Sequence, residues 1–305
     1  MSDRVAAVDC GTNSIRLLIA DLVDGSLREV DRRMTIVRLG QGVDATGAFA
    51  PEALDRVFSA SDDFAAAIRA AGATRTRFVA TSAARDVRNR DVFFAGIRER
   101  FGVEPDIISG AEEASLTFRG ATSGLVALHV PGPYLVADIG GGSTELVLGD
   151  TTGVRAAESL DIGSVRLTER HVTTDPTSPA ELAAIAKDID ALLDGTTVPI
   201  AEARALVGVA GTVTTVAAIA LDLPEYDRTQ VHHARISGPR LRDTTTWLTS
   251  STRADRSAVR AIHPGRVDVI GAGALILQRL YDRMAVDEVL VSEHDILDGV
   301  ALSLG

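Results

Sequence analysis

Residues 134–149 of the 305-residue chain read Tyr-Leu-Val-Ala-Asp-Ile-Gly-Gly-Gly-Ser-Thr-Glu-Leu-Val-Leu-Gly. An apolar run ends at Asp138, three glycines follow, and a second apolar run begins after residues 143–145. This pattern predicts a strand, a tight turn and a second strand. Glycines leave room for a ligand to approach the backbone N–H groups, and Ser143 and Thr144 add hydroxyl donors. The turn is therefore suited to binding phosphate.

Two acidic residues flank this turn. Asp138 and Glu145 carry hard oxygen ligands, which could hold a divalent cation that neutralises the bound phosphate. The stretch therefore predicts a phosphate-binding turn with a metal site beside it. For a single stretch of this kind, the alternative is an ordinary hairpin with incidental acidic residues.

A second stretch near the start of the chain has the same plan. An apolar run ends at Asp9, residues 11–14 read Gly-Thr-Asn-Ser, and residues 15–20 form another apolar run. The two aspartates lie 129 residues apart, so the duplication is on the scale of whole domains. Two such turns facing one another would hold a phosphorylated ligand from both sides.

Length and composition indicate a globular protein of two domains. The chain has 46% hydrophobic and 24% charged residues, which are ordinary globular values. No run of eighteen uncharged apolar residues is present, and the first residues lead into a strand without a signal-peptide apolar region, so we expect a soluble cytoplasmic protein and no membrane partner. Cys10 is the single cysteine, which excludes internal disulfides and thiolate zinc clusters.

The charge balance excludes another class of ligand. A formal net charge of −11 argues against nucleic-acid binding, because phosphate contacts along a nucleic acid need a basic surface. A phosphate-rich ligand must then be met locally, by a few arginines and a metal. The chain contains no Gly-Lys-Ser or Gly-Lys-Thr, so a Walker P-loop is excluded.

The remaining pattern alternates strands with helices, which indicates an α/β fold in two similar halves. A segment rich in Gly, Pro and small residues at 120–133 marks the expected domain boundary. Gly211 and Thr212 follow a buried strand and begin a helix, so they are a candidate binding site for a nucleotide phosphate. The alternative is an ordinary connection between a strand and a helix. We expect strands at 28–37, 77–80, 105–109, 155–160, 205–210 and 286–291, and helices at 51–71, 92–101, 179–193, 213–221, 269–281 and 296–304.

Several segments in order along the chain resemble the exopolyphosphatase and guanosine pentaphosphatase family (Ppx/GppA), a branch of the actin, Hsp70 and sugar-kinase fold. They are residues 8–17, 80–85, 109–114, 138–145, 160–167, 208–212 and 262–273. The resemblance implies an α/β fold of two actin-like (ribonuclease H-like) domains, 1–122 and 123–305, with the ligand between them. It also implies a homodimer and release of terminal orthophosphate from inorganic polyphosphate.

The resemblance assigns roles to individual residues. Glu113 would activate the attacking water, whereas the neighbouring Glu112 is the weaker candidate because one helical turn cannot aim both carboxylates at the same water. Acids in a first helical turn are otherwise macrodipole partners. Asp138 and Glu145, with Asp9, would serve Mg²⁺ or another divalent cation, and K⁺ is an additional option. The phosphate-binding residues would be Asn13, Ser14, Arg16 and Arg85 in the first domain and Gly140, Gly141, Gly142, Ser143, Thr144 and Arg266 in the second.

Two departures from the family pattern affect the expectation. Family members commonly have Leu-Arg-Glu-Gly near the end, where residues 297–299 here read Leu-Asp-Gly. Larger relatives carry extra C-terminal helical domains that extend the polyphosphate channel, and residue 305 ends this chain without them. We therefore expect a preference for short polyphosphates and weaker processivity on long ones.

Other functions remain open at this point. The same fold could remove the terminal phosphate of guanosine pentaphosphate (pppGpp), act as a kinase with residues 208–212 as its nucleotide seat, or bind polyphosphate or nucleotide as a non-catalytic sensor. Cys10 and Arg16 have the Cys-x5-Arg spacing of cysteine phosphatases, but the residues that follow predict a strand and not the helix that would activate the thiol. His263, close to Arg266, is a further candidate for contact with substrate.

Overall fold

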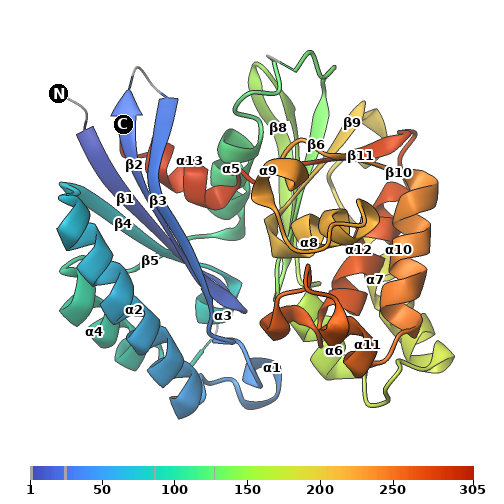
Figure 1. The fold of residues 1–305 in the computed structure, drawn as a ribbon, viewed down its shortest axis with the longest axis horizontal. Helices are drawn as coiled ribbons and strands as arrows, with labels where there is room; N and C mark the ends of the chain where they lie inside the picture. The colour runs from blue at the N-terminus through green and yellow to red at the C-terminus, as the bar shows by residue number, and fades with distance from the viewer. Residues whose placement is uncertain (1–2, 24–25, 86, 127) are drawn as a thin grey trace. The chain divides into compact units, whose positions relative to one another are not determined.

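The computed structural model describes residues 3–23, 26–85, 87–126 and 128–305. The chain divides into two compact units. Unit 1 comprises Met1–Gly120 and Ile296–Gly305, and unit 2 comprises Ala121–Asp295. Each unit has a mixed sheet with helices packed against it, which confirms the expected α/β class (Figure 1).

The sheet of unit 1 has the strand order β3-β2-β1-β4-β5. Its strands are β1 (Asp3–Cys10), β2 (Ser14–Val23), β3 (Ser26–Ile36), β4 (Arg75–Ala80) and β5 (Asp106–Ile107). The first three form an antiparallel meander, whereas β4 pairs in parallel with both β1 and β5. Because helices cover both faces of the sheet, β1 is buried over its last six residues and its sequence is apolar without alternation.

Alternate residues of β1 face opposite sides of this sheet. Ala6, Val8 and Cys10 face the helices α2 (Pro51–Ala71) and α4 (Arg90–Phe101), whereas Val5 and Ala7 face the C-terminal helix α13 (Ile296–Leu302). Helix α2 begins with a proline and ends at Gly72, which has φ of 69°. The other helices of this unit are α1 (Val43–Thr46), α3 (Ser82–Arg85) and α5 (Gly110–Ala121).

The sheet of unit 2 repeats this topology. Its order is β10-β11-β9-β6-β7-β8, with β6 (Tyr134–Ile139), β7 (Thr144–Asp150), β8 (Gly153–Leu160), β9 (Ala205–Val209), β10 (Arg235–Ser237) and β11 (Glu288–Val291). Strands β6, β7 and β8 form an antiparallel meander, and β6 then pairs in parallel with β9 as β1 does with β4. The repeat read from the sequence is therefore a repeat of the fold.

Helices cover the sheet of unit 2 and bury a single large apolar cluster. Helix α7 begins with a capping box between Ser178 and Glu181, and its Asp190 forms ion pairs with Arg279 and Arg283. The helices are α6 (Ser164–His171), α7 (Pro179–Asp194), α8 (Ala210–Ala220), α9 (Arg228–Val231), α10 (Gly238–Ser250), α11 (Arg253–Ala258) and α12 (Ile270–Tyr281), with the short 3₁₀ turns η1 (Ile200–Glu202) and η2 (Pro264–Arg266).

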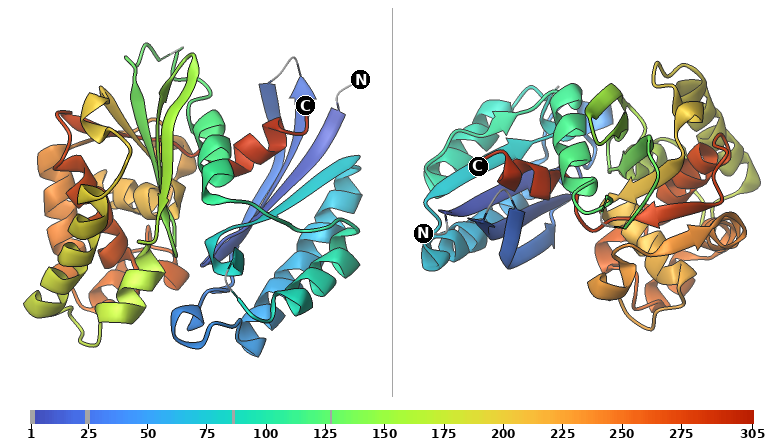
Figure 2. Two further views of the ribbon diagram at one scale, coloured as in Figure 1. Left: turned by 180° about the vertical axis from the view of Figure 1, so that it is seen from behind. Right: turned by 90° about the horizontal axis from the view of Figure 1, so that it is seen from above.

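The C-terminal helix differs from the expected domain division. The sequence placed residues 123–305 in one domain, but the structure groups Ile296–Gly305 with unit 1. The physical reason is burial, because the apolar side chains of α13 pack on those of β1 and β2. Figure 2 shows the helix, in red, beside the sheet of unit 1. None of the helices in the described part of the chain combines the length and the apolar character needed to cross a membrane.

Candidate active site

The two turns predicted to bind phosphate have the same backbone geometry. The Gly11 N–H donates to Ser14 O at 2.9 Å, and the Gly140 N–H donates to Ser143 O at 3.0 Å. In both hairpins the aspartate is the last residue but one of the first strand, and it is paired with a charged residue near the start of the next strand, Asp9 with Arg16 and Asp138 with Glu145. Each turn follows the central strand of its sheet, at the carboxyl end where open α/β sheets bind ligands.

In unit 2 the carbonyls of the glycine turn are bound by the start of α6. Gly140 O accepts from Ser164 N at 3.0 Å, Gly141 O accepts from Val165 N at 2.9 Å, and Gly142 O accepts from Arg166 Nε at 2.7 Å. In a trans peptide the N–H points opposite to the C=O, so the next three N–H groups along the chain point away from α6. Successive N–H groups on one side of a turn form an anion-binding nest.

The turn of unit 1 is held in the same way. Thr12 O accepts from Gly40 N at 2.8 Å, and Asn13 O accepts from the N–H groups of Val37 and Arg38 at 2.9 Å. In both units the anchoring segment comes directly after the third strand of the meander. The orientation of both turns is therefore built into the repeated topology.

The glycine turn and α6 approach one another too closely for a side chain at Gly163. A Cβ on Gly163 would lie 2.4 Å from both the carbonyl carbon and the carbonyl oxygen of Gly141, and 2.6 Å from the carbonyl carbon of Gly142. Gly163 has φ of −150°, which any residue adopts, so the close approach alone requires glycine here. Sequence reasoning matched the segment 160–167 to the family but did not assign Gly163 or Arg166 to the site.

The charged pair beside the turn differs between the units. In unit 1, Arg16 donates to Asp9 Oδ2 through two nitrogens, at 2.5 and 3.0 Å. In unit 2 the corresponding pair is Asp138 and Glu145, which are paired in the strand register and both buried. Unit 1 thus has a cation where unit 2 has a second carboxylate, and Asp9, expected as a metal ligand, forms an ion pair with Arg16 through its Oδ2 atom.

Hydroxyl groups orient the carboxylate of Glu145. Its Oε1 accepts hydrogen bonds from Ser143 Oγ and Ser159 Oγ, each at 2.7 Å. Thr144, predicted to bind phosphate, is buried and donates its hydroxyl hydrogen to Ile162 O at 2.7 Å. The hydroxyl hydrogens of Ser143 and Thr144 are therefore committed within unit 2, and the donors suited to phosphate are the backbone N–H groups.

The donor set at Asp138 and Glu145 fits a magnesium ion. Mg²⁺ takes one or two carboxylates from a protein and completes its shell with waters and phosphate oxygens. Two buried carboxylates opposite one another on adjacent strands supply such a set. Over residues 3–23, 26–85, 87–126 and 128–305, no group of three His, Cys, Asp or Glu side chains could hold a metal by itself.

The two adjacent glutamates in the first turn of α5 have different environments. Glu113 is buried, with 6% exposure, and forms an ion pair with Arg85, whose Nε also donates to Ile108 O at 3.2 Å. Glu112 has a 44% exposed side chain and accepts from Arg77 at 2.6 Å. This difference supports the choice of Glu113 over Glu112.

The predicted residues of unit 1 lie at one edge of its sheet. The turn follows β1, Arg85 lies on α3 just after β4, and Glu113 lies on α5 just after β5. Backbone hydrogen bonds join these strand ends, from Thr81 N to Cys10 O and from Ile108 N to Ala80 O, both at 3.2 Å. Two ion pairs, Arg16 with Asp9 and Arg85 with Glu113, therefore lie at this edge of the sheet.

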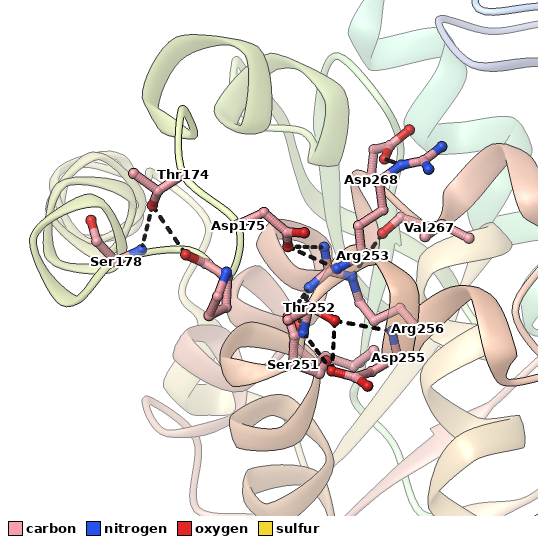
Figure 3. Close-up of polar contacts among 12 residues, drawn as sticks. Thr174, Asp175, Ser178, Ser251, Thr252, Arg253, Asp255, Arg256, Val267 and Asp268 are labelled. Carbon is pink, nitrogen blue, oxygen red and sulfur yellow. Dashed lines mark hydrogen bonds and ion pairs between the residues drawn. The ribbon is translucent and has the colours of Figure 1, made fainter.

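Besides the two turns, a third candidate phosphate position lies at the start of α8, in unit 2. Arg266 lies so close to Gly211 that a Cβ there would be 2.1 Å from its guanidinium, and Arg266 donates to Thr215 Oγ1 at 3.1 Å. Helix α11 holds the residues that follow Arg266, because Arg256 donates to Val267 O and Arg253 to Asp268 (Figure 3). A fixed guanidinium beside a helix N-terminus is a suitable environment for an anion.

Cys10 does not have the environment of a catalytic thiol. It is 1% exposed in the apolar cluster of unit 1, and burial, with the nearby charge of Asp9, raises its pKa well above the usual value. Arg16, which follows the five residues after Cys10, binds Asp9. Only the thiolate is nucleophilic, so this buried position argues against the cysteine-phosphatase alternative.

The predicted site residues fall into two sets, one in each unit. Unit 1 carries Asp9, Asn13, Ser14, Arg16, Arg85 and Glu113, and unit 2 carries Asp138, Gly140, Gly141, Gly142, Ser143, Thr144, Glu145 and Arg266. Within unit 1 the structure joins Asp9 to Arg16 and Arg85 to Glu113. The other candidate, His263, caps η2 by accepting from Gly265 N at 3.1 Å.

Comparison with known proteins identifies the family of this chain. The chain is 49% identical to Exopolyphosphatase 2 of Mycobacterium tuberculosis, over 99% of this chain and 98% of that protein. The crystal structure of an exopolyphosphatase-like protein superposes with a TM-score of 0.97 at 44% identity and covers 100% of this chain and 98% of its own. A guanosine-5'-triphosphate,3'-diphosphate pyrophosphatase of Vibrio atlanticus is 35% identical over 54% of this chain and 33% of its own. The model of the Ppx/GppA phosphatase family matches residues 18–304, and this chain belongs to that family.

Proposed function

We propose that this protein is an exopolyphosphatase, which hydrolyses the terminal phosphoanhydride bond of inorganic polyphosphate and releases orthophosphate. The observation that carries the proposal is the glycine turn of unit 2, whose three outward N–H groups lie beside the buried carboxylates Asp138 and Glu145. An anion nest next to a cation site suits a phosphoryl group that is bound with a metal. The name of the M. tuberculosis relative supports polyphosphate as the substrate.

We assign the proton transfer to Glu113. Its carboxylate would take a proton from a water molecule as the water oxygen bonds to the terminal phosphorus and the bond from that phosphorus to the bridging oxygen breaks. The electron pair of the broken bond would leave with the shortened chain. General-base catalysis of this kind contributes about 10² to 10⁴ in rate.

The remaining work is electrostatic. Phosphoryl transfer depends mainly on neutralising charge and on aligning the nucleophile. Arg16 and Arg85 in unit 1 and Arg266 in unit 2 would bind phosphate oxygens, and arginine matches these oxygens bidentately. Mg²⁺ at Asp138 and Glu145 would supply positive charge next to the phosphate oxygens. Asp9 would orient Arg16 by the ion pair seen in the structure.

The second candidate substrate is pppGpp. The Vibrio relative supports it, and both substrates end in a phosphoanhydride that the same groups could cleave. We also propose a homodimer, on the basis of the family resemblance. Light scattering of the purified protein measures its oligomeric state directly.

The proposal is tested by initial rates of phosphate release with Mg²⁺. The substrates are tripolyphosphate, polyphosphates of tens and of hundreds of units, pppGpp and ATP, at equal concentrations of chain ends. We expect release from polyphosphate, with short chains preferred. Release from pppGpp alone would replace polyphosphate as the substrate, a rate that rises steadily to the longest chains would refute the length preference, and binding of any of these ligands without release would indicate a sensor.

A further inference from the structure

The C-terminal helix α13 contacts the helix that carries Glu113 at a single tight point. A Cβ on Gly299 would lie 1.9 Å from the carbonyl oxygen of Leu116 and 2.6 Å from its carbonyl carbon. Leu116 is one helical turn beyond Glu113 on α5, so the two residues lie on one side of that helix. Figures 1 and 2 show α13 beside α5. Since the atoms that Gly299 meets belong to the backbone, the contact fixes the position of α5 and not only that of a side chain.

Arg77 makes a second connection between the same two helices. From strand β4, its NH1 group donates to Ser303 Oγ at 3.0 Å, directly after the end of α13. Its NH2 group donates to Glu112 at 2.6 Å, in the first turn of α5, and to Asp106 at 2.7 Å. One guanidinium thus joins the end of α13 to the residue next to Glu113.

A third contact fixes α13 to the sheet. Asp298 is 3% exposed and accepts from Arg32 on β3, with Oδ1 at 2.6 Å and Oδ2 at 3.3 Å. Replacing one partner of a buried ion pair is strongly destabilising, so this pair resists sliding of α13 along the sheet. The helix is therefore a fixed support against which α5 rests.

We propose that Arg77 and Gly299 are positioning residues for Glu113: α13, fixed by Arg32, sets where the first turn of α5 lies and hence where the Glu113 carboxylate meets water. The inference rests on the proposed function, since it assumes that Glu113 is the general base. A helix transmits a shift at Leu116 to Glu113 because the two are joined by rigid backbone one turn apart. A displacement of about 1 Å in a reacting group costs about 10²-fold in rate.

The first test removes the Arg77 bridge without adding volume. In Arg77→Met, Ser303→Ala and Glu112→Met we expect kcat to fall, by up to roughly tenfold, with KM unchanged, because substrate binding groups stay in place. The double variant Arg77→Met with Glu112→Met should lose no more than the worse single variant, since both changes remove the same hydrogen bond. Arg98→Met is the matched control, because it breaks an exposed ion pair with Glu104 away from α5. A normal kcat in all three variants, or an equal loss in Arg98→Met, would overturn the proposal.

The second test adds volume at the helix contact. In Gly299→Ala, α5 and α13 must separate by about 1 Å to bring the 1.9 Å approach to the shortest real contacts near 3.0 Å, so we expect kcat to fall about 10²-fold. Gly96→Ala is the control, because its Cβ would lie 2.3 Å from the Phe58 ring in another helix contact of unit 1. Both variants should lose thermal stability, but only Gly299→Ala should lose kcat in the protein that remains folded. Equal kcat in the two variants would contradict a positioning role.

A measurement without turnover separates this inference from the proposed function. In protein labelled with ¹³C at glutamate carboxyl carbons, the Glu113 resonance is assigned by its disappearance in Glu113→Gln. We expect that resonance to shift in Arg77→Met and Ser303→Ala and to stay in place in Arg98→Met. If the wild-type protein cleaves no phosphoanhydride, the proposed function fails while this shift can still be observed; if Glu113 does not shift, the positioning inference fails whatever the activity.

Discussion

Replacing Gly163 with alanine tests whether the contact with α6 holds the glycine turn in its working position. The new Cβ would lie 2.4 Å from Gly141, and ordinary van der Waals contact begins at 3.4 Å, so the turn and α6 must separate by about 1 Å. Overpacking of this kind costs about 1–3 kcal/mol of stability. Moving the phosphate-binding N–H groups by about 1 Å costs about 10²-fold in kcat/KM.

The assay is phosphate release from tripolyphosphate with Mg²⁺, combined with thermal unfolding. Gly195→Ala is the matched control, because Gly195 ends α7 in the same unit, has helical φ and ψ, and would place its Cβ at an ordinary 3.4 Å from Ala191 O. We expect Gly195→Ala to retain wild-type kinetics. Gly163→Ala with wild-type kcat/KM, or an equal loss in the control, would refute the reasoning.

If Gly163→Ala does not fold, Arg166→Met tests the same anchor without adding volume. This change removes the 2.7 Å hydrogen bond from Arg166 Nε to Gly142 O. We expect a smaller loss of kcat/KM with a melting temperature within a few degrees of the wild type, since the net contribution of one hydrogen bond is about 1 kcal/mol. An unchanged kcat/KM in this variant would show that α6 does not orient the turn.

Three further predictions follow from particular side chains. Cys10→Ala should retain full activity per folded molecule, because the buried thiol has a raised pKa and takes no part in the reaction; loss of a phosphoenzyme intermediate in that variant would reverse this conclusion. Glu145→Gln keeps an acceptor for the Ser143 and Ser159 hydroxyls but removes a charge, so the Mg²⁺ concentration for half-maximal activity should rise by at least about tenfold, and an unchanged Mg²⁺ titration would contradict the assigned metal site. Burial, reinforced by the charges of His294 and Arg235, lowers the pKa of His233 in the folded protein. Below the ordinary histidine pKa of about 6.5, the unfolded chain therefore binds a proton more readily than the folded protein does. The free energy of unfolding should then fall from pH 7 to pH 5. In urea unfolding, the free energy of unfolding of His233→Asn should fall less between pH 7 and pH 5 than that of the wild type. His129→Asn is the control and should fall as the wild type does, because His129 is exposed and has the same left-handed backbone. Equal pH dependence in both variants would rule out His233 as the cause.

The sequence predicts the fold well where the pattern is local and repeated. The turns that follow Asp9 and Asp138, each with a glycine two residues after the aspartate, predict two hairpins. The structure shows both hairpins with matching hydrogen bonds. The glycine turn at residues 140–142 predicts an anion site because glycines have no side chains to keep a ligand from the backbone N–H groups. The order of strands and helices follows from apolar runs and their punctuation, so it is predictable with little need for long-range contacts.

Other features depend on contacts between distant residues, and the sequence does not determine them. The return of α13 to unit 1 reflects packing of its apolar face on β1 and β2, and an apolar helix pattern does not specify its partner. The ion pair of Asp9 with Arg16 follows from strand register, which an apolar run does not specify residue by residue. The hydroxyl of Thr144 points to Ile162 O because its strand position buries it. Arg77 joins three acceptors that lie far apart along the chain, so no local motif marks it.

The most direct test of the central claim is single-turnover phosphate release from tripolyphosphate by the wild-type protein and by Glu113→Gln, with binding of the substrate measured in parallel. Glutamine has the shape of glutamate but cannot accept the proton, so we predict a loss of about 10² to 10⁴ in rate with binding retained. Glu112→Gln, which changes the exposed neighbour, should stay within about tenfold of the wild type. Near-normal turnover in Glu113→Gln would contradict the assignment of Glu113 as the general base.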